Sequence, residues 1–149
     1  MKKTICIDFD GVIAQYKEWK GANHFGAPVS GVQNALKVLK KEGYRIIIFT
    51  TRQVSDSLKA YLKENDITYD YINENPDQPK DSNQGKPIAD IYLDDRGMCF
   101  RGDWKWTLEE IARFKPWTRD NAEEKKEMES IFDNYRKLSK DFNKTCNSL

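Results

Sequence analysis

The chain has 149 residues and a formal net charge of +1, which fits one domain and gives no general attraction to nucleic acid or to an anionic membrane. Its three cysteines lack C-x-x-C spacing and there is one histidine, so the composition excludes a disulfide framework and a thiolate zinc site. No segment approaches the roughly 18 apolar residues of a membrane span, and we expect a soluble, unexported protein of the cytoplasm.

The first apolar run, from Thr4 to Ile13, begins with β-formers that predict a strand buried on both sides within a parallel sheet. Two acids, Asp8 and Asp10, stand at the carboxyl end of this strand. Carboxylates are costly in such a place unless they have partners. Ligands of open α/β sheets bind at this edge, so we interpret the two acids as functional. The simpler alternative is an ordinary turn after the strand.

Residues 13–29 are rich in turn formers and have no clean periodicity, which predicts a flap or hairpin that leans over the acids. Trp19 in this segment either stacks on a sugar or base or pins the flap to the domain, and we favour pinning. His24 is a lone histidine in the same segment. Such a residue is more often a surface or packing residue than a ligand.

A capping box at Ser30 predicts a helix that ends at Gly43, and an apolar strand follows over residues 44–49. The helix makes this a right-handed βαβ unit, so the second strand ends at the same sheet edge as the first. It delivers three polar residues there: Thr50, Thr51 and Arg52.

A short helix over residues 57–63 and a third strand over residues 67–72 repeat this pattern. The polar segment 73–87 has no periodicity and predicts a long loop, either functional or disordered, with Lys86 near its end. A fourth apolar strand begins at Ile91 and ends in Asp94 and Asp95. Two strands therefore end in pairs of carboxylates.

Residues 98–101 predict a short edge strand, and a capping box at Thr107 predicts a helix to about Phe114. From residue 120 the chain is highly charged, with apolar residues at helical spacing: Met128, Ile131, Tyr135, Leu138 and Phe142. We predict an α/β fold, a doubly wound and mainly parallel sheet of about five strands with helices on both faces. This domain covers residues 1–117, and an amphipathic helical extension covers residues 118–149.

The carboxyl edge of this sheet should present six side chains: Asp8, Asp10, Thr50, Lys86, Asp94 and Asp95. Four carboxylates beside one ammonium favour a divalent cation, and hard oxygen ligands select Mg²⁺ over zinc. Phosphoryl transfer fits this set. A carboxylate that attacks a phosphate meets repulsion of roughly 4 kcal/mol per charge pair at about 4 Å and an effective dielectric constant of about 20. Mg²⁺ and Lys86 would offset that repulsion.

The chain resembles the haloacid dehalogenase-like hydrolase superfamily through four stretches that follow the family's order: residues 8–12 (DFDGV), 46–50 (IIIFT), 85–87 (GKP) and 92–95 (YLDD). The resemblance covers about residues 4–101 and leaves the tail outside it. It implies a Rossmannoid catalytic domain. Four motifs at the ends of the correct elements are far more specific than any one of them.

The resemblance implies that Asp8 is a nucleophile that forms an aspartyl-phosphate, and that Asp10 protonates the leaving group and then activates water. An acid two residues after the nucleophile points to phosphate esters, because dehalogenase members lack it. Thr50, Thr51 and Lys86 would bind the substrate phosphate, and Lys86 would also neutralise Asp8.

Magnesium would be held by Asp8, Asp10, Asp94 and Asp95, with the main-chain carbonyl of Asp10 as one ligand and Asp94 as the more direct of the last pair. Arg52 and Arg96 follow motif residues and could reach substrate, but we favour surface or structural pairing for both. Thr50 and Lys86 taken singly would be an ordinary strand-end hydroxyl and a solvated lysine.

The chain has no room for a large cap domain, since the flap is short and no helical domain fits between Thr50 and Lys86. The substrate is thus either a small phosphorylated metabolite or a phosphorylated polymer end. The apolar stripe of the tail either packs on its own domain or pairs with a second subunit in a homodimer.

Two other classes of function remain open. A phosphorylatable receiver module also combines acids, a threonine and a lysine on a parallel sheet, but it carries its acceptor acid on the third strand, where this chain has Asn73. A non-catalytic scaffold of the same fold could bind a partner without turnover. Every position of the catalytic set is filled, which favours an enzyme.

Overall fold

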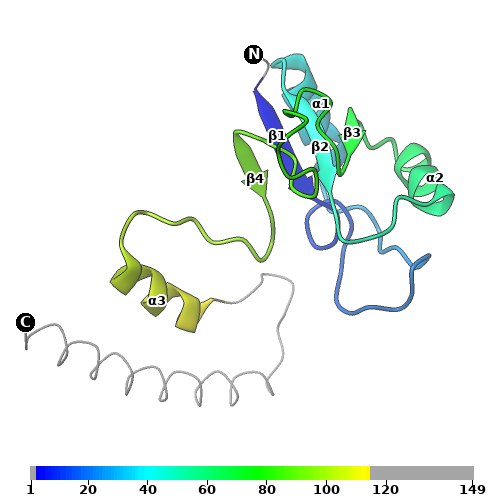
Figure 1. The fold of residues 1–149 in the computed structure, drawn as a ribbon. Coiled ribbons are helices and arrows are strands. Elements are labelled where there is room, and N and C mark those ends of the chain that lie inside the picture. Colours follow the sequence, from blue (N-terminus) through cyan, green and yellow to red (C-terminus); the bar gives the residue numbers. More distant parts are fainter. Residues whose placement is uncertain (1–2, 115–149) are drawn as a thin grey trace, which may run out of the picture. The chain divides into compact units, whose positions relative to one another are not determined.

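The computed structural model describes residues 3–114, and these form a parallel α/β unit followed by a further helix (Figure 1). The strands are β1 (Thr4–Asp8), β2 (Arg45–Phe49), β3 (Tyr71–Ile72) and β4 (Ile91–Leu93). The helices are α1 (Val32–Lys41), α2 (Asp56–Glu64) and α3 (Trp104–Arg113). All pairings are parallel in the order β3-β2-β1-β4, which confirms the predicted α/β class.

Both helices of the βαβ units pack on one face of the sheet. Ile5 pairs in register with Ile46, and Ile7 pairs with Ile48, so these four side chains share a face. They form one buried cluster with residues of the two helices: Val32, Leu36, Leu58 and Leu62. The apolar stripes that the sequence places on α1 and α2 therefore meet the sheet and fix where its strands end.

The loop between β3 and β4 covers the opposite face. Cys6 and Tyr92, which are paired in register, lie on that face, and the Tyr92 hydroxyl donates to the carbonyl of Pro87. Pro87 is fully buried, and buried Gln78 donates to the carbonyls of Asn83 and Lys86. The segment predicted as a long loop is thus ordered by its own side chains and serves as the cover of this face.

Two local predictions differ from the structure. The capping box at Ser30 is not formed, because Gly31 is the N-cap of α1 and no side-chain hydrogen bond caps the helix. The third strand is shorter than predicted, because the Asp70 carboxylate accepts from Ile46 N and Lys40, so strand pairing begins only at Tyr71. The flap predicted over residues 13–29 does form, with isolated bridges such as that between Ala14 and Pro28.

The chain divides into two compact units, Met1–Gly97 and Met98–Leu149. In the described part of the second unit, no strand forms over residues 98–101, so the sheet has four strands among the described residues and not about five. Helix α3 begins before Thr107, because the Asp103 side chain accepts from Trp106 N and acts as the N-cap. The predicted domain boundary at residue 117, the helix over 118–149 and the homodimer that depends on it lie outside the described residues.

Among the described residues, no helix is long and apolar enough to cross a membrane.

Candidate active site at the carboxyl edge of the sheet

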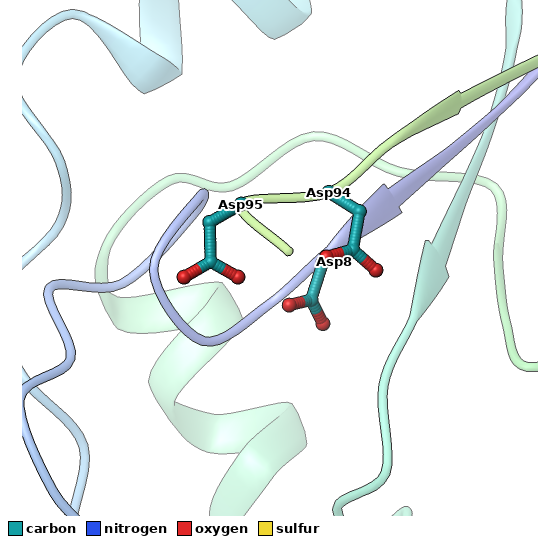
Figure 2. A group of neighbouring side chains, drawn as sticks. All are labelled: Asp8, Asp94 and Asp95. Carbon is teal, nitrogen blue, oxygen red and sulfur yellow. The ribbon is translucent and has the colours of Figure 1, made fainter. Parts of the chain in front are cut away.

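Three carboxylates meet where β1 and β4 end side by side. Ile7 pairs with Leu93, so the next residues, Asp8 and Asp94, leave the sheet at the same level. Asp8, Asp94 and Asp95 each offer a carboxylate oxygen, and these oxygens lie within 4.8 Å of one another (Figure 2). The structure thus brings together three of the four predicted metal ligands, and this cluster could hold a metal ion.

Gly11 permits the close approach of the loop after β1 to Asp95. Its φ is +88°, in the region that favours glycine, and a Cβ at this position would lie 2.7 Å from Asp95 Oδ2. Asp95 is itself buried, with an ion-pair distance of 3.8 Å from its Oδ1 to Arg96 Nε. The glycine of the DFDGV stretch is therefore required both by the turn and by the space that Asp95 occupies.

The electrostatic setting of Asp8 is unusual for a carboxyl group. Burial raises its pKa from 3.8 to about 7, and the neighbouring Asp94, Asp95 and Asp10 carboxylates add to the rise. A hydrogen bond from Phe9 N to Asp8 Oδ1, at 2.8 Å, opposes it. A cation at this cluster would reverse the balance, since it would stabilise the ionised carboxylates.

The Asp10 side chain is not part of this carboxylate cluster but is bound by Arg52. Arg52 donates from Nε to Asp10 Oδ2 at 2.8 Å and from Nη2 to Asp10 Oδ1 at 2.9 Å. Arg52 Nη1 also donates to the flap carbonyl of Ala22 at 3.2 Å. The structural pairing that we favoured for Arg52 is confirmed, and it joins the flap to Asp10. The part of Asp10 in a metal site stays a prediction.

Thr50 is held by a residue that the sequence did not single out for this purpose. Asn73 accepts from Thr50 N at 2.7 Å and donates to the Thr50 carbonyl at 2.8 Å. The Thr50 hydroxyl oxygen accepts from Arg52 N at 3.1 Å. Asn73 has a φ of +56°, which asparagine tolerates better than most residues, and an Asn directly after a strand was the available signal.

Lys86 lies on the loop that covers the face of Cys6 and Tyr92. Its ammonium is 4.9 Å from the centroid of the Tyr92 ring, a cation–π contact. It is close enough to Cys6 to oppose the rise that burial causes in the pKa of that thiol, to about 11. The structure thus places Lys86 beside β4, while its predicted contact with Asp8 and a phosphate stays a prediction.

A cavity of about 560 Å³ opens over the carboxylates. Its lining includes most of the predicted set: Asp8, Asp10, Thr50, Thr51 and Asp94. Two flap aromatics, Tyr16 and Trp19, and the half-exposed Arg96 also line it. Charged and hydroxyl groups from strand ends and aromatic rings from the flap therefore share one cavity.

No protein-family model and no curated protein matches this chain. Among solved structures, a conserved protein of Bacteroides thetaiotaomicron is similar, with a TM-score of 0.54 and 24% identity over 77% of this chain and 93% of the other. A chain of the Pnkp1/Rnl/Hen1 RNA repair complex has a TM-score of 0.47 and 24% identity over 64% of this chain and 36% of the other. At 24% identity, the first similarity shows the fold alone. The TM-score of the second is too low to support an argument. The parallel sheet is consistent with a haloacid dehalogenase-like fold.

Proposed function

We propose that the protein is a Mg²⁺-dependent phosphatase that hydrolyses a phosphate monoester through an aspartyl-phosphate on Asp8. The observation that carries the proposal is the cluster of Asp8, Asp94 and Asp95 at the ends of two adjacent strands, of which Asp8 and Asp94 line one cavity with Thr50. The order of the four sequence motifs agrees with this assignment. Fold similarity alone would not support it, because one fold serves many activities.

The donor set fits magnesium. Asp8, Asp94 and Asp95 would hold the ion with hard carboxylate oxygens, and no histidine or cysteine joins this group among the described residues. Burial and the adjacent carboxylates raise the pKa of Asp8, and a cation at this cluster would stabilise the ionised carboxylate. When bound, the ion supplies positive charge that offsets repulsion between Asp8 and the substrate phosphate.

The proposed reaction has two steps on the residues of this chain. A carboxylate oxygen of Asp8 attacks phosphorus, the bond to the ester oxygen breaks, and the departing oxygen takes a proton from Asp10. Asp10 then takes a proton from water, which attacks phosphorus and releases inorganic phosphate and the Asp8 carboxylate. Thr50 can donate its hydroxyl hydrogen to a phosphoryl oxygen, because its oxygen is already the acceptor for Arg52 N.

Arg52 would position Asp10 as the base of the second step, in which the ionised carboxylate takes a proton from water. Its planar fork engages both oxygens of the carboxylate, so the side chain is fixed in orientation and also tied to the flap. A guanidinium suits this position better than an ammonium, because only the fork can bind both oxygens at once.

A second candidate is a phosphate-binding or receiver-like module without steady turnover. The one observation in its favour is the position of Lys86. The Lys86 ammonium contacts the Tyr92 ring, and its contact with Asp8 and a phosphate stays a prediction. A receiver would show at most slow loss of its own phosphoryl group, whereas the proposed enzyme releases phosphate continuously.

The test is steady-state release of phosphate from an aryl phosphate by the full chain. We expect turnover with Mg²⁺, loss of turnover with EDTA, and recovery when Mg²⁺ is restored. Asp8→Asn should remove the activity, and Asp81→Asn, an exposed acid on the covering loop, should retain it. Full activity after chelation and dialysis would contradict the metal assignment, and activity of Asp8→Asn at the wild-type rate would contradict the nucleophile.

A further inference from the structure

We propose that this site selects phosphate monoesters whose alcohol portion carries an aromatic ring, and that the ring stacks on Trp19. This inference rests on the proposed function for the site that binds the phosphate of the ligand. It rests on the flap for the site that binds the aromatic ring. Asp8 and Trp19 line the same cavity, so one ligand can reach both.

The flap has an anchor other than Trp19. That role belongs to Phe25, whose ring packs edge-on against the fully buried Phe9, with centroids 5.8 Å apart, and at 5.1 Å from the Tyr61 ring. The Tyr61 hydroxyl also donates to the Gly26 carbonyl at 2.8 Å. Trp19, in contrast, is 58% exposed. A large ring left in solvent at the wall of a cavity is a candidate contact for ligand.

The ring of Trp19 is held in place although it is exposed. The Arg52 guanidinium carbon lies 4.8 Å from the ring centroid, and the Arg52 side chain is only 4% exposed. The same guanidinium is fixed by its two bonds to Asp10 and by its bond to the Ala22 carbonyl. The contact therefore orders one side of the indole ring, which reduces the entropy that a stacking ligand would otherwise lose.

A second flap aromatic repeats this arrangement. The Arg96 guanidinium carbon lies 5.6 Å from the centroid of the Tyr16 ring, and both residues line the cavity. The cavity volume of about 560 Å³ lies within the roughly 300–1,000 Å³ range of small-ligand sites. The cavity therefore combines the carboxylates and hydroxyl of the proposed phosphatase site with aromatic rings that can contact the rest of the ligand.

The charge of the cavity lining favours a small ligand over a polymer. A groove that follows a nucleic-acid backbone needs a basic surface, whereas the charged residues that line this cavity are three acids, Asp8, Asp10 and Asp94, and one base, Arg96. A nucleoside monophosphate and an aryl phosphate both carry the required ring and phosphate. The two ligands differ in the distance between the ring and the phosphate. Kinetic measurements on both will therefore show whether the site prefers the ring of a nucleoside or that of an aryl group.

The experiment compares kcat/KM for four substrates with Mg²⁺: adenosine 5′-monophosphate, adenosine 3′-monophosphate, p-nitrophenyl phosphate and glycerol phosphate. We expect Trp19→Ala to lower kcat/KM about tenfold for at least one ring-bearing substrate, a size typical of stacking on an aromatic side chain. Glycerol phosphate should change little, and Trp19→Phe should restore most of the loss. Trp104→Ala, at an exposed tryptophan of the second compact unit, is the control.

Equal loss for all four substrates in Trp19→Ala would overturn the inference, because it would mean that Trp19 only holds the flap. Equal wild-type kcat/KM for glycerol phosphate and all ring-bearing substrates would also overturn it, while the phosphatase assignment would stand. A higher kcat/KM for a phosphorylated oligonucleotide than for either mononucleotide would overturn the small-ligand part.

Failure of the proposed function can be recognised separately. If the wild-type chain hydrolyses none of these esters, equilibrium binding of adenosine 5′-monophosphate still tests the ring contact. We expect the dissociation constant to rise about tenfold in Trp19→Ala and to be unchanged in Trp104→Ala. Equal dissociation constants for wild type and Trp19→Ala would overturn the inference in that case as well.

Discussion

Gly11 shows how a single missing side chain determines the spacing of the acids. A Cβ there would meet both Asp95 Oδ2, at 2.7 Å, and Asp95 Cγ, at 2.8 Å. The carboxylate would have to move, and it belongs to the cluster with Asp8 and Asp94. The Asp95 side chain is short and buried, so its carboxylate has little room to move away from such a Cβ and still meet Asp8 and Asp94.

We therefore predict that Gly11→Ala raises the Mg²⁺ concentration required for half-maximal activity by at least about tenfold, which is the order seen when groups that orient metal ligands are disturbed. Gly43→Ala is the matched control, because Gly43 has a similar φ of +86° but nothing within 4 Å of the position of a Cβ. Both variants should lose roughly 1 kcal/mol of stability from the backbone conformation. The same Mg²⁺ requirement in both variants would contradict the role of Gly11.

At the scale of elements, the flap is joined to the sheet edge by side chains and not by strand pairing. Arg52, in the loop after β2, donates to Asp10 and to the flap carbonyl of Ala22. Ser57 of α2 donates to Asn23 Oδ1 at 2.6 Å. The Arg52 guanidinium therefore couples the position of the flap at Ala22 to the Asp10 side chain.

We predict that Arg52→Lys lowers kcat at least about tenfold, because an ammonium cannot bind both Asp10 oxygens and the flap carbonyl in the same geometry. Arg45→Lys is the control, since Arg45 is also a partly buried arginine, with an ion pair to Asp77 outside the cavity lining. Steady-state kinetics on an aryl phosphate measure the effect. Unchanged kcat in Arg52→Lys would show that the fork does not position Asp10.

The elements that the sequence predicted best are those with strong apolar patterns. The runs that became β1 and β2 are apolar on both faces. The right-handed βαβ connection predicts that both strands end at the same edge of the sheet. Helix starts were less predictable, because several residues compete for one cap: Asp103 caps α3 where Thr107 was expected. Thr107 instead donates to the Asp103 carbonyl from within the first turn.

Contacts between distant residues could not be predicted from one sequence. Asn73 holds Thr50, which is 23 positions earlier, and Arg52 binds Asp10, which is 42 positions earlier. The sequence places each of these residues at the correct sheet edge. It cannot specify which side chains pair there, because that depends on side-chain rotamers and on the path of the flap.

For the molecule as a whole, the carboxylate cluster makes stability depend on pH. The Asp8 pKa is about 7 in the fold because of burial and of Asp94, Asp95 and Asp10, against 3.8 as its ordinary value. Between these two values the folded chain holds a proton that the unfolded chain has lost. Stability from this group is therefore complete below the unfolded pKa and is lost as pH rises toward the folded pKa.

We predict that the midpoint temperature of unfolding in EDTA falls between pH 5 and pH 7.5, and that Mg²⁺ reduces the fall because it binds the ionised carboxylates. Asp8→Asn should remove most of this dependence on pH. Thermal unfolding followed by circular dichroism measures both effects. A wild-type midpoint that rises over this range in EDTA, to the same extent as in Asp8→Asn, would contradict the raised pKa of Asp8.

The central claim, that Asp8 accepts the phosphoryl group, is tested most directly by looking for that group on Asp8. Asp10→Asn protein, mixed with an aryl phosphate and Mg²⁺ and quenched in acid, should carry one phosphoryl group on the peptide that contains Asp8, since the intermediate forms but its hydrolysis is slowed. Mass spectrometry of the digested protein locates the group, and the variant with both Asp8→Asn and Asp10→Asn should carry none. Phosphate release by Asp8→Asn at the wild-type rate, or a phosphoryl group on another residue, would contradict the account.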